Sequence, residues 1–265
     1  MFLDALIAIF FFLVGLEIKT GIKDFKTALV PMVAALGGML VPAAIYVLIN
    51  PGSHVWAASM PTDIALALGV LSLLGKRINP HVRLFLLTLA IADDFFSLIV
   101  LAIFYGDDLE PIKALTTLVA ATIGFLLPLR THALHKVIKV LTPLSTYFIV
   151  PVIVIVNIPL DINISAFTSQ TTIAIIIARS IGKIIGITLF AWLALRFGGH
   201  ANIGIKEITG IATLAGMGLT VALVIADIAA RSEVELDQVR LGLFVSAIIS
   251  GLAGYIWLRR TPAQL

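Results

Sequence analysis

Residues 89–97, LAIADDFFS, place two adjacent carboxylates in an apolar stretch that runs from Leu84 to Phe104 without glycine or proline. At about 1.5 Å of rise per residue, a helix of this length crosses the roughly 30 Å hydrocarbon core of a bilayer, with Asp93 and Asp94 near mid-depth. An ionised aspartate there costs about 2.5 to 3.5 kcal/mol unless it faces water, a cation or a shared proton. A helix cap would need a break that this stretch lacks, so we favour a functional role for both acids.

The composition is that of a membrane protein. Of the 265 residues, 60% are hydrophobic and 12% are charged, whereas soluble domains carry about 25% charged residues. The absence of cysteine excludes disulfides and thiolate metal sites. The chain has no G-x-x-x-x-G-K-[ST] motif, so nothing indicates nucleotide-driven pumping. We expect no enzymatic activity, no cofactor and, despite the net charge of +3, no nucleic-acid partner.

Nine apolar segments are long enough, or nearly so, to cross a bilayer, which predicts one all-α polytopic membrane domain over residues 1–265. They cover residues 2–16, 28–49, 56–74, 84–105, 114–129, 142–159, 171–195, 207–230 and 238–258. The connections alternate in charge: one side carries most of the 18 Lys and Arg residues, and the other only Lys113, Arg231 and Arg240. Basic loops face the cytoplasm, so we expect a cytoplasmic C-terminus, an outer N-terminus and a further helix before Met1.

Two of these segments contain internal helix breakers. In 56–74, the run Pro61-Thr62-Asp63 joins a residue without an amide hydrogen to two residues that favour helix starts. In 207–230, Gly216 and Gly218 interrupt the apolar run. Broken helices are tolerated at membrane depth only where they line a cavity or are buried in protein, and a matched pair of them is typical of transporters.

The broken segments occupy equivalent places in two triplets of spans. One triplet covers residues 28–105 and the other covers residues 171–258, and each has its broken segment in the middle. This symmetry predicts an inverted-repeat bundle with two discontinuous transmembrane helices. The segments 2–16, 114–129 and 142–159 would then be supporting helices.

Lys183 is a further charge expected at membrane depth. It lies about twelve residues from either end of 171–195, roughly 18 Å by helical rise, which is beyond the reach of a snorkelling lysine. Lys183 therefore needs an internal partner, and the mid-depth anions are Asp63, Asp93 and Asp94. A lone structural ion pair remains the alternative to a functional one.

The other candidate residues have simpler interpretations. At a broken helix, Asp63 can face the partial positive charge of free amide groups, a structural role that does not exclude a functional one. Arg179 is nearer its helix end than Lys183, so we expect it to reach interfacial water. His132 and His135 fall in a predicted connection without a third ligand nearby, so we expect no metal site there. Glu17 is expected at the cytoplasmic interface, where placing an ionised acid costs little free energy.

With these residues placed, the chain resembles the bacterial NhaA family of sodium/proton antiporters. The matching stretches, in the family's order, are ALIAIFFFLVGLEIK, ALGGMLVPA, PTDIALALGVLSLLGKR, LAIADDF, IGKIIGITLFAWLALR and GMGLTVAL. The resemblance implies an ion and proton site at Asp93 and Asp94, with Asp94 as the sodium ligand and Thr62 beside it. It also implies that Thr62 and Asp63 lie where the two broken helices cross. Asp63 would offset the helix N-termini, and Lys183 would offset the C-terminal ends and pair with Asp93.

The resemblance implies antiport of cytoplasmic sodium or lithium against external protons, for pH and sodium homeostasis in the bacterial inner membrane. Its partners would be these ions and the lipid bilayer. The family has twelve helices and this chain about nine, so the resemblance implies that two helices are missing after Asp94 and one before Met1. Family acids are replaced at Gly21 and near Ile138, and a family histidine by Leu115. The role of Glu17 in a pH response and the formation of a homodimer are therefore open.

Two other functions remain open from the sequence. A non-transporting, truncated scaffold or remnant of the family would account for the missing helices, although not for the charges kept at mid-depth. A sodium-coupled symporter of organic anions on a similar inverted-repeat fold would need an additional substrate pocket.

Overall fold

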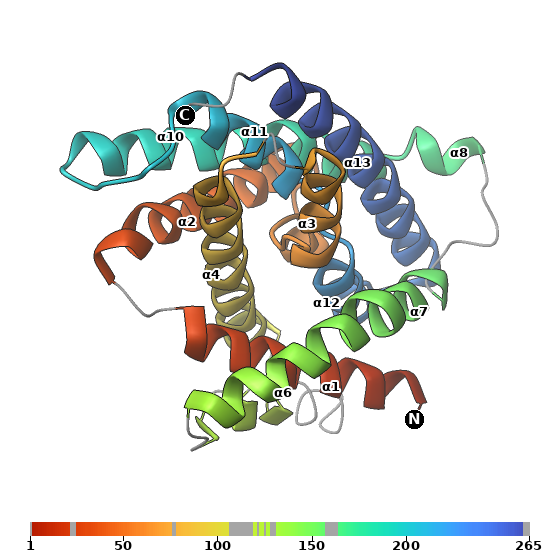
Figure 1. Cartoon of the computed structure of the whole chain (residues 1–265). Helices are drawn as coiled ribbons and strands as arrows, with labels where there is room; N and C mark the ends of the chain where they lie inside the picture. The colour runs from red at the N-terminus through yellow and green to blue at the C-terminus, as the bar shows by residue number, and fades with distance from the viewer. Residues whose placement is uncertain are drawn as a thin grey trace.

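The regular elements of the described chain are all helical. The structure, a computed structural model, describes residues 2–21, 25–75, 78–105, 119–120, 122–124, 126–127, 131–156 and 164–261. Its helices are α1 (Phe2–Gly21), α2 (Phe25–Ile49), η1 (His54–Ser59), α3 (Ile64–Leu73), α4 (Pro80–Phe104), α6 (Thr131–Leu144), η3 (Ser145–Ile149), α7 (Val150–Val156), α8 (Ile164–Phe167), α9 (Gln170–Ile177), η4 (Ala178–Gly182), α10 (Lys183–Arg196), α11 (Ile205–Ala215), α12 (Thr220–Ala229) and α13 (Glu233–Arg260). Figure 1 shows α3 in the middle of the bundle, between α4 and α13.

Within these residues, the helices that are long and apolar enough to span a membrane match the two predicted triplets. Five are Ala28–Ile49, His54–Leu73, Pro80–Phe104, Gln170–Arg196 and Glu233–Arg260, and the sixth is the pair α11 and α12, bent by 48°. The prediction of an all-α polytopic membrane protein is thus confirmed. That the triplets are inverted repeats stays a prediction.

The supporting segments differ from the prediction in one place. The segment 2–16 lies within α1, and 114–129 lies mostly outside the described residues. The helix that contains the predicted span 142–159 begins before that span, at Thr131, and continues through α6, η3 and α7 to Val156. Which part of it crosses the membrane stays a prediction. The basic residues that were assigned to the preceding connection lie in α6, where they recur three and four positions apart, the spacing of one helix face.

Both predicted helix breaks are present. The first separates η1 from α3, where Pro61 has no amide hydrogen to donate and Asp63 caps α3 by accepting from the amides of Ala65 and Leu66. The second separates α11, which ends at Ala215, from α12, which begins at Thr220. Sequence breakers of different kinds, proline in one case and glycine in the other, therefore give two helices that stop and restart inside the bundle.

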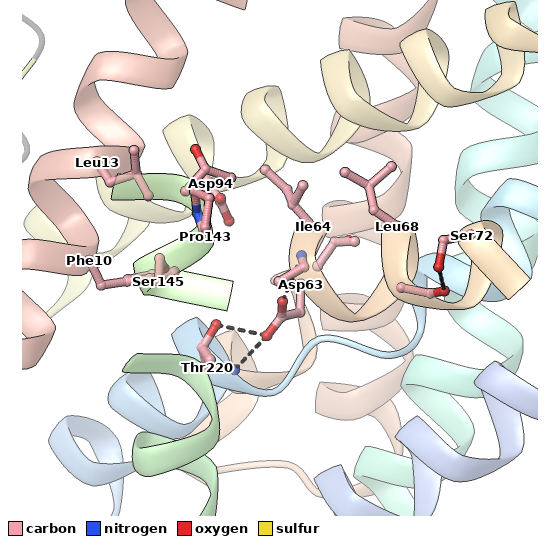
Figure 2. Close-up of a pocket in the computed structure, with 14 residues that line it drawn as sticks. Phe10, Leu13, Asp63, Ile64, Leu68, Ser72, Asp94, Pro143, Ser145 and Thr220 are labelled. Carbon is pink, nitrogen blue, oxygen red and sulfur yellow. Dashed lines mark hydrogen bonds between the residues drawn. The ribbon is translucent and has the colours of Figure 1, made fainter. Parts of the chain in front are cut away.

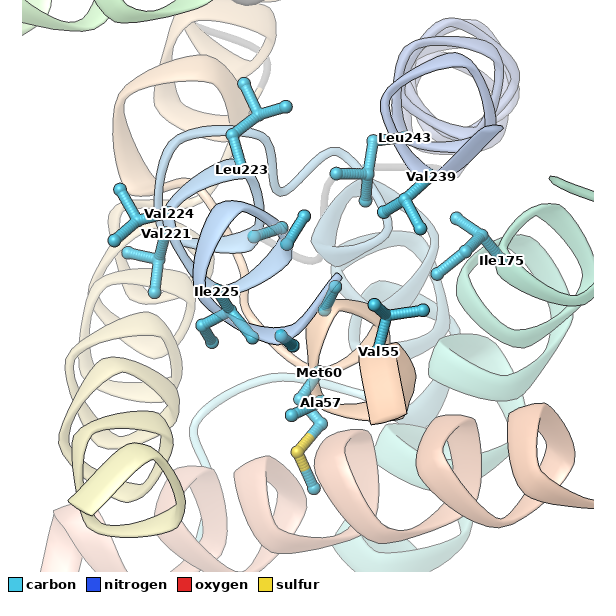
Figure 3. Packing of buried hydrophobic residues seen from close by; sticks show 14 of the residues in the cluster. Val55, Ala57, Met60, Ile175, Val221, Leu223, Val224, Ile225, Val239 and Leu243 are labelled. Atoms are coloured by element: carbon cyan, nitrogen blue, oxygen red, sulfur yellow. The ribbon is translucent and has the colours of Figure 1, made fainter. Parts of the chain in front are cut away.

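Two apolar clusters hold the half-helices on either side of these breaks. The first packs η1 and α12 against α9 and α13, and Figure 3 shows Val55, Ile225 and Leu243 pointing into it. The second packs α3 and α11 against α4 and α10, with Leu71 and Leu86 fully buried. The breaks lie between the clusters, so the polar groups exposed by each break sit between two packed apolar layers.

Glycines bring α2 and α10 into backbone contact. A Cβ atom added to Gly186 would lie 2.1 Å from the carbonyl oxygen of Gly37, and one added to Gly182 would lie 3.0 Å from the Cα atom of Pro42. This close approach fixes the face of α10 that carries Lys183 toward the interior, where Lys183 is fully buried. The glycines therefore matter for the site as well as for packing.

We predict that Gly186→Ala destabilises the protein by about 1 to 3 kcal/mol, because the new methyl group overpacks a backbone contact. The measurement is the melting temperature of the detergent-solubilised protein. Gly69→Ala is the matched control, because a Cβ atom at Gly69 would meet no atom within 4 Å. Alanine also has a higher helix propensity than glycine. Equal melting temperatures for the two variants would contradict the prediction.

Candidate functional site

The two breaks cross in direct contact. A Cβ atom on Gly218 would lie 2.1 Å from the carbonyl oxygen of Pro61, so only glycine fits there. The hydroxyl group of Thr62 also lies 3.3 Å from the carbonyl oxygen of Ala215, at the end of α11. The crossing brings together two helix N-termini, those of α3 and α12, and two C-terminal ends, those of η1 and α11.

Asp63 binds both N-termini at the crossing. Its Oδ1 atom accepts from the amides of Ala65 and Leu66 at 3.0 and 3.2 Å. Its Oδ2 atom accepts from Thr220, at 3.3 Å from the amide nitrogen and 2.9 Å from the hydroxyl group (Figure 2). Because each helix N-terminus carries about half a positive charge, one carboxylate matches the two together. The sequence alone assigns no role to Thr220, although it follows two glycines and threonine is a residue that favours helix starts.

Lys183, Asp93 and Thr62 form a buried triangle beside the crossing. Lys183 Nζ lies 2.8 Å from Asp93 Oδ2 and donates to Thr62 Oγ1 at 2.9 Å. Thr62 Oγ1 in turn donates to Asp93 Oδ2 at 2.5 Å. Asp93 Oδ1 is also buried, yet it accepts no hydrogen bond from any described residue. Buried carboxylate oxygens are rarely left without a partner, and bound water or an ion is one explanation for such an oxygen.

Asp94 faces a cavity. Adjacent residues on a helix point about 100° apart, and Asp94 lines a hollow of about 450 Å³ together with Thr62, Asp63 and Thr220 (Figure 2). The remaining lining residues are Phe10, Leu13, Ile64, Ala65, Leu68, Gly69, Ser72, Thr142, Pro143 and Ser145. The cavity therefore follows α3 from the crossing to the exposed Ser72, at the end that leads into a basic connection. It gives Asp94 a route to one face of the protein.

The expectation for Arg179 is wrong. Its side chain is 0% exposed, inside the crossing. Nη1 donates to Ala58 O at 2.8 Å, Nη2 to Pro61 O at 2.9 Å and to Gly218 O at 2.7 Å, and Nε to Gly216 O at 3.4 Å. Its distance from the helix end is compatible with snorkelling, and nothing in the sequence indicates that two other helices end beside it.

The remaining predicted residues are placed as follows. The carbonyl groups at the C-terminal ends, which the resemblance assigned to Lys183, are bound by Arg179. His132 and His135 lie in α6 and not in a connection. The prediction for Glu17 concerns a side chain outside the described part of the chain. The structure thus brings together Thr62, Asp63, Asp93, Asp94 and Lys183, the predicted site residues whose side chains it describes.

A family model and individual related proteins point to the same family. The family described as Na+/H+ antiporter 1 matches residues 1–130 and 114–258. Proteins called Na(+)/H(+) antiporter NhaA are similar over 97% of this chain and 82% of their own length: those of Salmonella arizonae (32% identical), Salmonella typhimurium (33%) and Shewanella baltica strain OS195 (32%).

These comparisons also locate the difference in length. The Salmonella arizonae alignment covers 317 positions, more than the 265 residues of this chain, so that relative carries internal segments without a counterpart here. The two family matches meet around residues 114–130, near the place where two helices were predicted to be missing. With both broken helices matched and the aspartate pair inside the first match, the chain belongs to the Na+/H+ antiporter 1 family.

Proposed function

We propose that this protein exchanges cytoplasmic sodium or lithium for external protons across the bacterial inner membrane, and so contributes to pH and sodium homeostasis. The observation that carries the proposal is the position of Asp94, which lines the cavity at the crossing of two broken helices. By the positive-inside rule, the basic connection after α3 and the C-terminus face the cytoplasm. The cavity then leads from the cytoplasm to Asp94.

The site offers oxygen ligands that suit a hard cation. The carboxylate of Asp94, the hydroxyl group of Thr62 and the unpartnered Oδ1 atom of Asp93 would hold sodium together with water. Protons bind to the same carboxylate oxygens, so sodium and protons compete for one site. An occupant of either kind neutralises charge that is costly at membrane depth.

Exchange follows from that competition. A site with two ionised aspartates and no bound ion is costly to move across an apolar barrier, whereas a sodium-loaded or protonated site is less so. The protein therefore changes its access mainly when loaded. If Asp93 leaves Lys183 to bind sodium, Lys183 loses its anionic partner and releases a proton to the cavity. More than one proton would then move per sodium ion, which makes the exchange electrogenic.

We predict that Asp94→Asn abolishes sodium-driven and lithium-driven proton movement, because an amide neither titrates nor neutralises the cation. The measurement is a fluorescence assay of proton efflux from everted membrane vesicles. Asp237→Asn is the matched control, since that side chain is 41% exposed at the start of α13. Undiminished exchange by Asp94→Asn would contradict the assignment of the site. Absence of exchange in the wild-type protein would favour a non-transporting scaffold.

We also predict that Asp63→Asn lowers stability by about 1 to 3 kcal/mol, because the amide loses one acceptor and the negative charge that faces the N-termini of α3 and α12. The melting temperature should fall, and exchange should weaken because Thr62 precedes Asp63 at the break. The same substitution at Asp227, which is exposed, should leave the melting temperature unchanged. Equal effects at the two positions would argue against capping by Asp63.

A further inference from the structure

Arg179 binds two helix ends that belong to different broken helices. Ala58 and Pro61 lie at and just after the end of η1, whereas Gly216 and Gly218 follow α11. All four contacts are made to backbone carbonyl oxygens, and no carboxylate of the described chain forms an ion pair with Arg179. The direct hydrogen bonds of this buried guanidinium group therefore all go to peptide carbonyl dipoles.

The charges of the crossing balance without Lys183. Each C-terminal helix end carries about half a negative charge and each N-terminus about half a positive charge. The two C-terminal ends thus match the single charge of Arg179, as the two N-termini match Asp63. Lys183 and Asp93 neutralise each other at 2.8 Å. No helix end is left over for Lys183 to offset.

We propose that Arg179 is a positioning residue that supplies the fixed positive charge of the crossing and holds both breaks in the geometry that the cation site needs. This inference rests on the proposed exchange function, which it deepens. The guanidinium fork suits the task because it presents five donors in one plane and stays charged at all physiological pH values. Its turn of helix, η4, is π-helical, a local irregularity that is frequent at functional sites.

Because Arg179 binds the helix ends, Lys183 does not have to. In the described chain, its hydrogen bonds go to Asp93 and Thr62 and to no carbonyl group. If Lys183 were the fixed charge, each loss of its proton would expose two negative helix ends in the protein interior. With Arg179 in place, a proton can leave Lys183 while the crossing stays neutral. The fixed charge and the exchangeable proton therefore belong to different residues.

The first experiment compares melting temperatures of purified proteins. Arg179→Gln removes the fixed charge and should lower the melting temperature by about 10 °C or prevent folding. The double variant Asp93→Asn with Lys183→Gln removes both charges of an ion pair, so its melting temperature should remain within about 3 °C of that of the wild-type protein. Ile181→Ala is the control, because this neighbour of Arg179 is 51% exposed and binds no carbonyl group. The opposite ranking would assign the fixed charge to Lys183 and overturn the proposal.

The second experiment uses Arg179→Lys, which keeps the charge but loses the planar fork. An ammonium group has three donors, so it cannot hold four carbonyl groups at once. The variant should fold, and its apparent KM for sodium should rise about tenfold because Thr62 is no longer held in place. A residue that only stabilises the fold would change the melting temperature without changing the KM. A wild-type KM in Arg179→Lys would therefore overturn the positioning role.

The two proposals can fail separately. The ranking of melting temperatures needs no transport, so it tests Arg179 even if the wild-type protein exchanges no sodium. If the wild-type protein exchanges sodium and Arg179→Gln matches it in both melting temperature and KM, the proposal for Arg179 is wrong and the antiport function stands.

Discussion

The structure depends on how two interrupted helices are neutralised inside a membrane. Each interruption leaves unpaired peptide groups and a pair of opposite partial charges where water is scarce. Antiparallel crossing places like ends together, so one anion and one cation are sufficient. Asp63 serves the N-termini of α3 and α12, and Arg179 serves the ends of η1 and α11. Because Gly218 allows the backbones to touch, both side chains reach both helices.

Because Asp63 and Arg179 neutralise the crossing, Asp93 and Asp94 are not needed to neutralise the helix ends. Asp93 and Asp94 are neighbours in the sequence, but the turn of α4 gives them different surroundings. Asp93 is held by Lys183 and Thr62, whereas Asp94 lines the cavity beside Asp63. One acid is therefore paired with a buried lysine, and the other lines a cavity. The close approach of α2 and α10 through Gly37 and Gly186 keeps Lys183 within reach of that pair.

Much of this arrangement could be predicted from the sequence. Apolar length identified the spans, and Pro61 and Gly216 identified the breaks, because these signals act through local backbone physics. The depth of Lys183 required an internal anion, and Asp93 is that anion. The role of Arg179 could not be predicted, because it depends on where two distant helix ends lie in space. The start of α6 was missed because basic residues on one helix face resemble a loop in composition.

The cavity beside α3 has an electrical consequence. On one side of Asp94 it runs to the exposed Ser72, while on the other side Leu101, in the C-terminal half of α4, and Tyr105, which follows α4, pack into an apolar cluster. If water fills the cavity in the membrane, a membrane voltage falls almost entirely across the packed half, because water conducts and hydrocarbon does not. A charge that crosses it gains or loses about 2.3 kcal/mol per 100 mV. In the proposed exchange, ion entry through a water-filled cavity would depend little on voltage, and any step that moves charge across the packed half would carry most of the voltage dependence.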